Sequence, residues 1–172
     1  MGYTHYFTQK QTVDALIWKN FREHMDKLYH HYQANPIPAE QIGGGYLDKP
    51  IVLCDGLGEN VLNTGTLFTH DGETLYFNGD AKDEMNHDTF MVNRQIPERC
   101  TKYRDYCKTA YKPYDVFVVA ALLLLYNLCP GCFSVSSDGD ARDWQPVLEY
   151  VSTVLPHLDL SLPDNIRCSE MS

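Results

Sequence analysis

The sequence predicts a single α+β domain in which a largely antiparallel sheet packs against about three helices. The 172 residues suffice for one domain, and we assign residues 1–156 to it and residues 157–172 to a loosely ordered C-terminal tail. Hydrophobic residues make up 44% of the chain and charged residues 22%, which excludes a wholly disordered protein. Segments with a hydrophobic period of two alternate with segments of helical period, in the order β-α-β-β-β-β-β-α-β-α.

Three segments have the apolar spacing of helices. Thr12 is expected to cap the first, which ends before Pro36. Residues 114–128 form the second, which is apolar on nearly every side and should be covered by the sheet and other helices. Asp140 or Asp143 is expected to cap the last, because Pro146 is tolerated only in a first turn. The apolar stripe of the first helix is Ile17, Phe21, Met25, Leu28 and Tyr32, and that of the last is Trp144, Val147, Leu148, Val151 and Leu155.

Short β-rich runs separated by turn residues predict the strands. Aromatic and polar residues alternate over residues 2–9, which indicates an N-terminal strand. Residues 70–73 are typical of a hairpin turn, since Gly72 can take a positive φ. Residues 80–86 are expected to form a polar loop. The other strands are predicted at residues 51–54, 66–69, 74–77, 89–92, 103–108 and 133–136.

The chain is acidic, with 23 Asp and Glu residues against 14 Lys and Arg residues and a net charge of −9. This charge repels the phosphates of a long duplex, so we expect no long nucleic acid as a partner. No basic and apolar leader follows Met1, and the longest apolar run, residues 116–126, is far shorter than the ~20 residues that span a bilayer. We therefore expect a cytoplasmic protein without a membrane partner, whose six cysteines are free thiols.

The basic residues gather in one segment. Residues 94–112 hold six of the 14 Lys and Arg residues against two acidic ones, whereas residues 70–90 hold six acidic residues against one lysine. One interpretation is a pair of solvated faces that neutralise each other. The other is a local site for an anion.

The anion site would lie where Lys108 and Lys112 meet the amino end of the second helix. Unpaired N–H groups and the helix dipole favour an anion at such an end. Thr109 would add a hydroxyl group and Tyr114 an aromatic face, although Asp115 competes for the same donors. Phosphate beside a stacking ring is the chemistry of a nucleotide ligand.

Other motifs carry less information. His87 and Asp88 are of the type that holds a cation, but they precede a predicted strand without further ligands, so no metal or other cofactor is predicted. Cys129 and Cys132 follow a helix C-terminus, where the dipole disfavours a thiolate, and we expect a tight turn with two buried thiols. Asp138 ends a strand, where it could ligate a cation, accept from a ribose hydroxyl or serve in an ordinary turn. No phosphate-binding Gly-x-x-x-x-Gly-Lys loop or Gly-x-Ser-x-Gly elbow occurs.

Four motifs occur in order along the chain: Met-Gly-Tyr-Thr-His-Tyr at residues 1–6, Phe-Asn-Gly followed by His-Asp-x-Phe at 77–90, Cys-Lys-Thr-x-x-Lys-Pro-Tyr-Asp at 107–115, and Val-Ser-Ser-Asp-Gly at 135–139. Together they resemble a family of small proteins encoded by bacteriophages and prophages, over nearly the whole chain to about Leu155. The chain departs from the family pattern at Asp88, where the family has Glu, and at Tyr111, where it has Arg. The resemblance implies an accessory protein of the infected host cytoplasm and supplies no known reaction.

The first functional hypothesis is a binding protein that sequesters a small phosphorylated ligand without catalysis. The family context implies that this ligand is a nucleotide-derived host immune signal. The predicted ligand-binding residues come from all four motifs: Lys108, Thr109 and Lys112 for phosphate, Tyr114 or Tyr6 for stacking, and His5, Asn78, His87 and Asp138 for polar contacts.

Two alternatives remain open at this stage. One is an inhibitor that docks directly on a host defence protein through an acidic, tyrosine-rich surface. The other is a metal-dependent nucleotide hydrolase that uses His5, His87, Asp88 and Asp138. A homo-oligomer is compatible with each of them.

Overall fold

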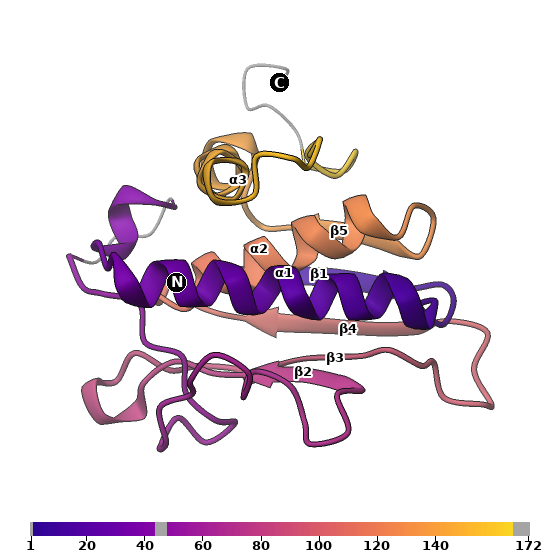
Figure 1. Ribbon diagram of the computed structural model, residues 1–172, viewed down its shortest axis with the longest axis horizontal. Coiled ribbons are helices and arrows are strands. Elements are labelled where there is room, and N and C mark those ends of the chain that lie inside the picture. The colour runs from indigo at the N-terminus through magenta and orange to yellow at the C-terminus, as the bar shows by residue number, and fades with distance from the viewer. Residues whose placement is uncertain (1, 44–47, 167–172) are drawn as a thin grey trace.

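The computed structural model describes residues 2–43 and 48–166, which form three α-helices and two antiparallel sheets, so the predicted α+β class is confirmed. Figure 1 shows α3 at one end of the molecule and the β2–β3 hairpin at the other, with α1, α2, β1 and β4 between them. The elements in chain order are β1 (Thr4–Gln9), α1 (Ala15–Ala34), the 3-10 helix η1 (Ala39–Gln41), β2 (Thr74–Phe77), the 3-10 helix η2 (Ala81–Asp83), β3 (Phe90–Asn93), β4 (Tyr103–Lys108), α2 (Asp115–Leu128), β5 (Phe133–Ser137) and α3 (Ala141–Val154).

β1 is the central strand of the larger sheet, whose order is β4-β1-β5. Both neighbours are antiparallel to it, and His5 lies opposite Cys107 on one side and Ser137 on the other. Side chains alternate between the two faces, so His5 and Phe7 point into the core while Tyr6 points away from it. The N-terminal strand therefore joins the two later strands that carry sequence motifs.

α2 is the centre of the hydrophobic core. Every residue from Asp115 to Leu125 is buried, which confirms that this apolar segment is a covered helix. The helix contacts α1, α3 and β5, and Phe117 lies edge-on to Tyr29 and Tyr32 of α1. A helix that is apolar all round needs cover on every side, and these elements supply it.

α1 begins two residues later than predicted. Its N-cap is Asp14, whose carboxylate accepts from the backbone N–H groups of Leu16 and Ile17, whereas Thr12 accepts from the backbone N–H of Ile96. The buried stripe includes Trp18 and Tyr29 in addition to the predicted Phe21, Met25, Leu28 and Tyr32, whereas the predicted Ile17 is only partly buried. The stripe is wider than predicted because α1 packs against residues 62–75 as well as against α2.

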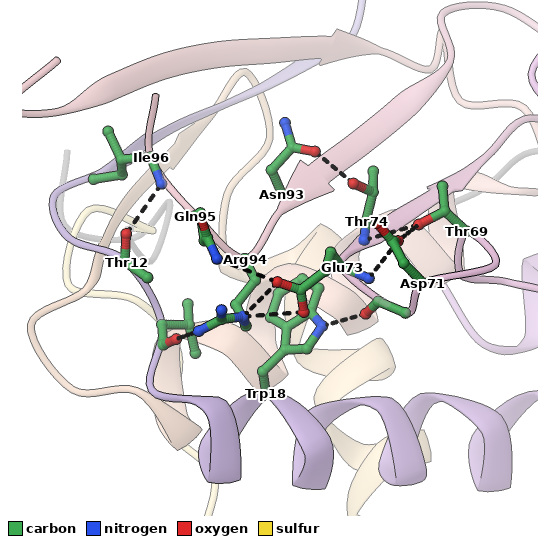
Figure 2. Close-up of polar contacts among 12 residues, drawn as sticks. Thr12, Trp18, Thr69, Asp71, Glu73, Thr74, Asn93, Arg94, Gln95 and Ile96 are labelled. Atoms are coloured by element: carbon green, nitrogen blue, oxygen red, sulfur yellow. Dashed lines mark hydrogen bonds and ion pairs between the residues drawn. The ribbon is translucent and has the colours of Figure 1, made fainter. Parts of the chain in front are cut away.

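The Arg94–Glu73 ion pair joins the two ends of the β2–β3 hairpin, and hydrogen bonds from Arg94 and Trp18 connect the hairpin to the start of α1 (Figure 2). The Arg94 Nε lies 3.0 Å from the Glu73 carboxylate, and its Nη1 donates to the Val13 carbonyl at 3.0 Å. Trp18 of α1 donates its indole N–H to the Gly72 carbonyl at 2.7 Å. Gly72 has a φ of +75°, and a side chain there would strike the Arg22 guanidinium. The turn predicted at residues 70–73 is therefore confirmed, and glycine is required in it.

Two predicted strands are wrong. Residues 51–54 and 66–69 form isolated bridges, Cys54 with Val61 and Asn78 and Phe68 with Leu75, but no ladder. An isolated bridge pairs the backbone hydrogen-bonding groups of one residue only. Residues 51–54 and 66–69 therefore cross the core as irregular backbone. The predicted loop at 80–86 contains η2.

The last helix is capped by Asp140, and Asp143 accepts from the Asp140 backbone N–H to complete a capping box. Pro146 lies inside this helix, so the expectation that it must occupy the first turn is wrong. The chain after α3 was expected to be loose, yet Leu158, Leu160 and Leu162 pack against the core and Ile166 is 6% exposed. Residues 167–172 lie outside the described residues.

Cys129 and Cys132 form a disulfide, which corrects the prediction of two free thiols. The turn through Pro130 and Gly131 brings the two Cα atoms to 5.5 Å, within the range that a disulfide requires. Cys54, Cys100 and Cys107 are free, and Cys168 lies outside the described residues.

Replacing Arg94 with alanine should lower the free energy of unfolding by about 1–3 kcal/mol, because Glu73 and the Val13 carbonyl lose a charged donor in a partly buried setting. Arg142→Ala is the matched control, since its side chain is 77% exposed and its pair with Asp140 should contribute less than about 1 kcal/mol. Urea denaturation of both variants measures the difference. Equal destabilisation would contradict the assigned role of Arg94.

Candidate functional site

Segments from the four sequence motifs meet at one end of the β4-β1-β5 sheet. The register places Thr4 opposite Lys108 and His5 opposite Ser137, and the Asp88 backbone N–H donates to the Lys108 carbonyl. The predicted site residues nevertheless fall into three separate places: the inner face of the sheet, its outer face, and the loop before β3. They do not line one cavity.

The inner face holds a buried polar cluster centred on Asp115, the first residue of α2. The Asp115 Oδ1 lies 2.6 Å from the His5 Nε2 and 2.6 Å from the Thr109 hydroxyl. The His5 Nδ1 lies 2.8 Å from the Ser137 Oγ, and the Gly139 backbone N–H donates to the same oxygen at 2.9 Å. His5 and Thr109 are completely buried. Five residues from β1, the β4–α2 turn, α2 and the end of β5 thus form one chain of hydrogen bonds.

The hydrogen-bond partners assign the proton on His5. An ionised Asp115 carboxylate can only accept, so the His5 Nε2 must donate to it. The neutral ring then has an unprotonated Nδ1, which accepts from the Ser137 hydroxyl. Ser137 receives the Gly139 N–H on its own oxygen. Every donor in this cluster therefore meets an acceptor, which is what a buried polar group needs to avoid a large desolvation cost.

Aromatic rings enclose this cluster. The Tyr3 ring stacks on Tyr111 at a centroid distance of 3.6 Å, and Tyr3 and Trp144 both lie edge-on to His5. Burial, followed by the negative charges of Asp115 and Asp143, raises the pKa of Tyr3, so its phenol stays protonated. A Cβ at Gly139 would strike the Tyr3 hydroxyl, which explains the glycine in the fourth motif.

The outer face of the same sheet is open and carries two tyrosines. Tyr6 and Tyr106 are direct partners across β1 and β4, and their side chains are 43% and 61% exposed. Two positions away on β4 in each direction lie Arg104, which is exposed, and Lys108, which is half-buried. Asp138 accepts from the Thr4 backbone N–H at 3.0 Å and from the Tyr6 hydroxyl at 3.4 Å. We call Tyr6, Tyr106, Arg104, Lys108 and Asp138 the tyrosine face.

The amino end of α2 does not form the expected anion site. The backbone N–H groups of Asp115, Val116 and Phe117 donate to the carbonyls of residues 112–114, and those of Thr109 and Ala110 to Tyr3. The Thr109 hydroxyl is bound to Asp115. The donors that would receive a phosphate are thus already paired: backbone carbonyls accept from the N–H groups, and Asp115 accepts from the Thr109 hydroxyl.

Three other predicted site residues organise the loop before β3. The Asn78 side chain is 2% exposed and bonds to the backbone of Gly56, Gly79 and His87. Tyr114 is completely buried, and its hydroxyl donates to the Asp88 carbonyl at 2.6 Å, so its ring has no face open to a ligand. His87 is exposed beside Asp88, with 3.5 Å between the Nδ1 and Oδ1 atoms.

The best-enclosed pocket near these residues is too small for a nucleotide. It lies between Pro50, Met85, Pro113 and Tyr114 and has a volume of about 70 Å³, whereas ligand pockets usually span ~300–1,000 Å³. Within residues 2–43 and 48–166, no group of three or more His, Cys, Asp or Glu residues is arranged to hold a metal ion. The described helices include none that is long and apolar enough to cross a membrane.

Sequence reasoning missed the central roles of Asp115, Ser137 and Tyr106. Asp115 was identified only as a competitor for the helix donors, and Ser137 only as part of a turn. Tyr106 has the strand alternation that places it on the same face as Arg104, but nothing in the sequence pairs it with Tyr6. Register across strands 100 residues apart is set by the whole fold.

Comparison with known proteins gives no match: no family model, curated protein or solved structure is significantly similar to this chain.

Thr109→Val should lower the free energy of unfolding by about 1–3 kcal/mol, because the isosteric side chain leaves one buried carboxylate lone pair of Asp115 without its donor. Thr8→Val, on the outer face of β1, is the matched control and should change stability by less than about 0.5 kcal/mol. Chemical denaturation followed by tryptophan fluorescence measures both. A neutral Thr109→Val variant would show that the cluster does not need this donor.

Proposed function

We propose that the protein binds and sequesters a phosphorylated, nucleotide-derived ligand on the tyrosine face. One observation carries this proposal: two exposed tyrosines lie directly opposite each other on an open sheet, between two basic side chains. Sequestration requires affinity and no chemical step. The proposal keeps Tyr6, Lys108 and Asp138 from the predicted site and adds Tyr106 and Arg104.

The tyrosine pair suits a planar base. Directly opposed residues of an antiparallel pair have Cβ atoms about 4.5–5.5 Å apart, so the Tyr6 and Tyr106 side chains leave the sheet side by side, and both can contact one base. Stacking of a base on an aromatic side chain contributes about 1–3 kcal/mol and tolerates any base. The Asp138 contact with the Tyr6 hydroxyl restrains that ring and reduces the entropy lost on binding.

The basic residues suit the phosphates. Arg104 and Lys108 each lie about 7 Å along β4 from Tyr106, given a rise of about 3.4 Å per residue, and they share its face. This distance matches a phosphate or pyrophosphate attached to a stacked nucleoside. The guanidinium of Arg104 can grip phosphate oxygens with two donors, and the Lys108 ammonium adds a second charge. Asp138 can accept from a ribose hydroxyl or a base amine.

The protein as a whole carries a charge of −9, so a nucleotide can approach only where basic residues are concentrated. Arg94, unlike Arg104 and Lys108, forms an ion pair with Glu73 in the hairpin. The resemblance to phage-encoded proteins supports a nucleotide-derived immune signal of the host as the ligand. Docking on a host defence protein is the competing function, and the experiment below distinguishes the two.

Isothermal titration calorimetry with ADP-ribose and cyclic dinucleotides should show binding that weakens as salt is added. Tyr106→Ala should weaken it at least tenfold by removing a stacking surface, and Lys108→Ala should also reduce the salt dependence. Lys82→Ala, an exposed lysine on η2, is the control and should bind like the unmodified protein.

Two results would contradict the proposal. One is no binding of any nucleotide in the panel by the unmodified protein. The other is recovery of a host polypeptide, with no nucleotide, when the protein is purified from infected cells, which would support docking instead.

A further inference from the structure

We propose that Ser137 is a nucleophile activated by His5, with Asp115 as the positioning residue, and that this site hydrolyses a small uncharged carboxylic ester. The proposal concerns the inner face of the sheet and is independent of the ligand on the tyrosine face. It rests on the geometry of three side chains that no sequence motif joins.

The distances meet the requirements of an activated serine. The Ser137 Oγ lies 2.8 Å from the His5 Nδ1, and the opposite ring nitrogen lies 2.6 Å from the Asp115 carboxylate. Both distances are within the 2.6–3.2 Å that nucleophile and base need. Asp115 holds the tautomer in which Nδ1 lacks a proton, and this is the form that can take the serine proton. Either imidazole nitrogen can act as the base, provided that the other donates to the carboxylate.

The carboxylate is itself held in place. The Thr109 hydroxyl donates to the same Asp115 oxygen that receives His5, at 2.6 Å. This second donor fixes the orientation of the carboxylate.

His5 and Ser137 differ in burial: a catalytic base is best shielded from water, whereas the nucleophile must be accessible. His5 has no exposed surface, and the edges of Tyr3 and Trp144 exclude water from its ring. Ser137 keeps partial exposure at the end of β5. We therefore place the approach of the substrate at this end of β5, beside the partly exposed Ser137, while the base behind it stays dry. The Gly139 N–H at 2.9 Å from the Ser137 Oγ also favours negative charge on that oxygen.

The charges around the site select the substrate class. Desolvation and then the carboxylates of Asp143, Asp115, Asp140 and Asp138 raise the pKa of Tyr111, which stacks on Tyr3 beside the cluster. Asp143 and Asp115, the two largest of these charge effects, disfavour an anion at the inner face, whereas Asp138 contacts Tyr6 of the outer face, where Arg104 and Lys108 offset its charge. An uncharged ester is not repelled, and this separates the reaction from the phosphorylated ligand of the outer face.

The reaction balances with water as the only co-reactant. The Ser137 Oγ adds to the acyl carbon while its proton moves to the His5 Nδ1. The alcohol leaves and takes that proton from His5, which leaves an acyl-serine ester. Water then gives a proton to His5 and adds to the acyl carbon, and Ser137 departs with the proton returned, releasing the carboxylic acid.

An uncharged fluorophosphonate tests the nucleophile directly. The Ser137 Oγ should displace fluoride and form a stable bond to phosphorus, and peptide mass spectrometry should locate the added mass on Ser137. Ser134→Ala, which removes an outward-facing serine of β5, should label at the unmodified rate. Ser137→Ala should not label. Hydrolysis of p-nitrophenyl acetate should likewise be unchanged in Ser134→Ala and lost in Ser137→Ala.

Asp115→Asn tests the positioning role. At neutral pH its labelling rate should fall at least a hundredfold, because the amide no longer holds the required tautomer. The slowly exchanging Nε2 proton of His5 should disappear from the NMR spectrum of the same variant, which a merely structural role of Asp115 would not require.

The residue that carries the label in the unmodified protein tests the proposal, even if a variant fails to fold. A folded protein that takes up no label, or takes it up only at another residue, would overturn it. Labelling at Ser137 in a protein that binds none of the nucleotides would support this proposal and contradict only the proposed function.

Discussion

The carboxylate of Asp115 is the constraint on which the rest of the structure depends. A charge at the start of a buried helix is costly unless hydrogen bonds surround it. Here one oxygen accepts from His5 of β1 and from Thr109 of the β4–α2 turn. Segments more than 100 residues apart are thereby joined at the point where the central helix enters the core. Removal of either donor leaves a buried charge partly unsatisfied, so the two faces of the sheet depend on the same contact.

The alternation of β1 assigns different tasks to neighbouring residues. His5 faces inward to Asp115 and Ser137, while Tyr6 faces outward beside Tyr106. A binding surface and a buried relay can therefore occupy one six-residue strand without competing for side chains. The end of β5 repeats this division, since Ser137 bonds to His5 and the next residue, Asp138, accepts from Tyr6.

Local patterns predicted much of the fold. The β2 and β4 bounds agree with the alternation of Thr74–Phe77 and Tyr103–Lys108, and the all-apolar α2 was recognised as buried. The wrong predictions, of a strand at residues 51–54 and of two free thiols, have physical causes. Residues 51–54 have strand composition but meet partners one residue at a time, and Pro130 and Gly131 bring two cysteines close enough to join. The first outcome depends on distant partners that local propensity does not describe, whereas the second follows from a local turn between residues three apart.

The site was predicted less well than the fold. The motifs do meet, but the sequence could not show that Lys108 and Thr109, adjacent in β4 and its turn, would face opposite sides of the sheet. Nor could it show that the amino end of α2 would pair its own donors. Site geometry follows from register and from the competition among donors for one carboxylate, and both are properties of the folded chain.

The direct measurement is the NMR spectrum of the His5 ring nitrogens near neutral pH. The account predicts an Nε2 proton that is held by Asp115, lies downfield, exchanges slowly with water and disappears in Asp115→Asn. A ring protonated at Nδ1, or an Nε2 proton that exchanges freely with water, would contradict the central role given to the contact between His5 and Asp115.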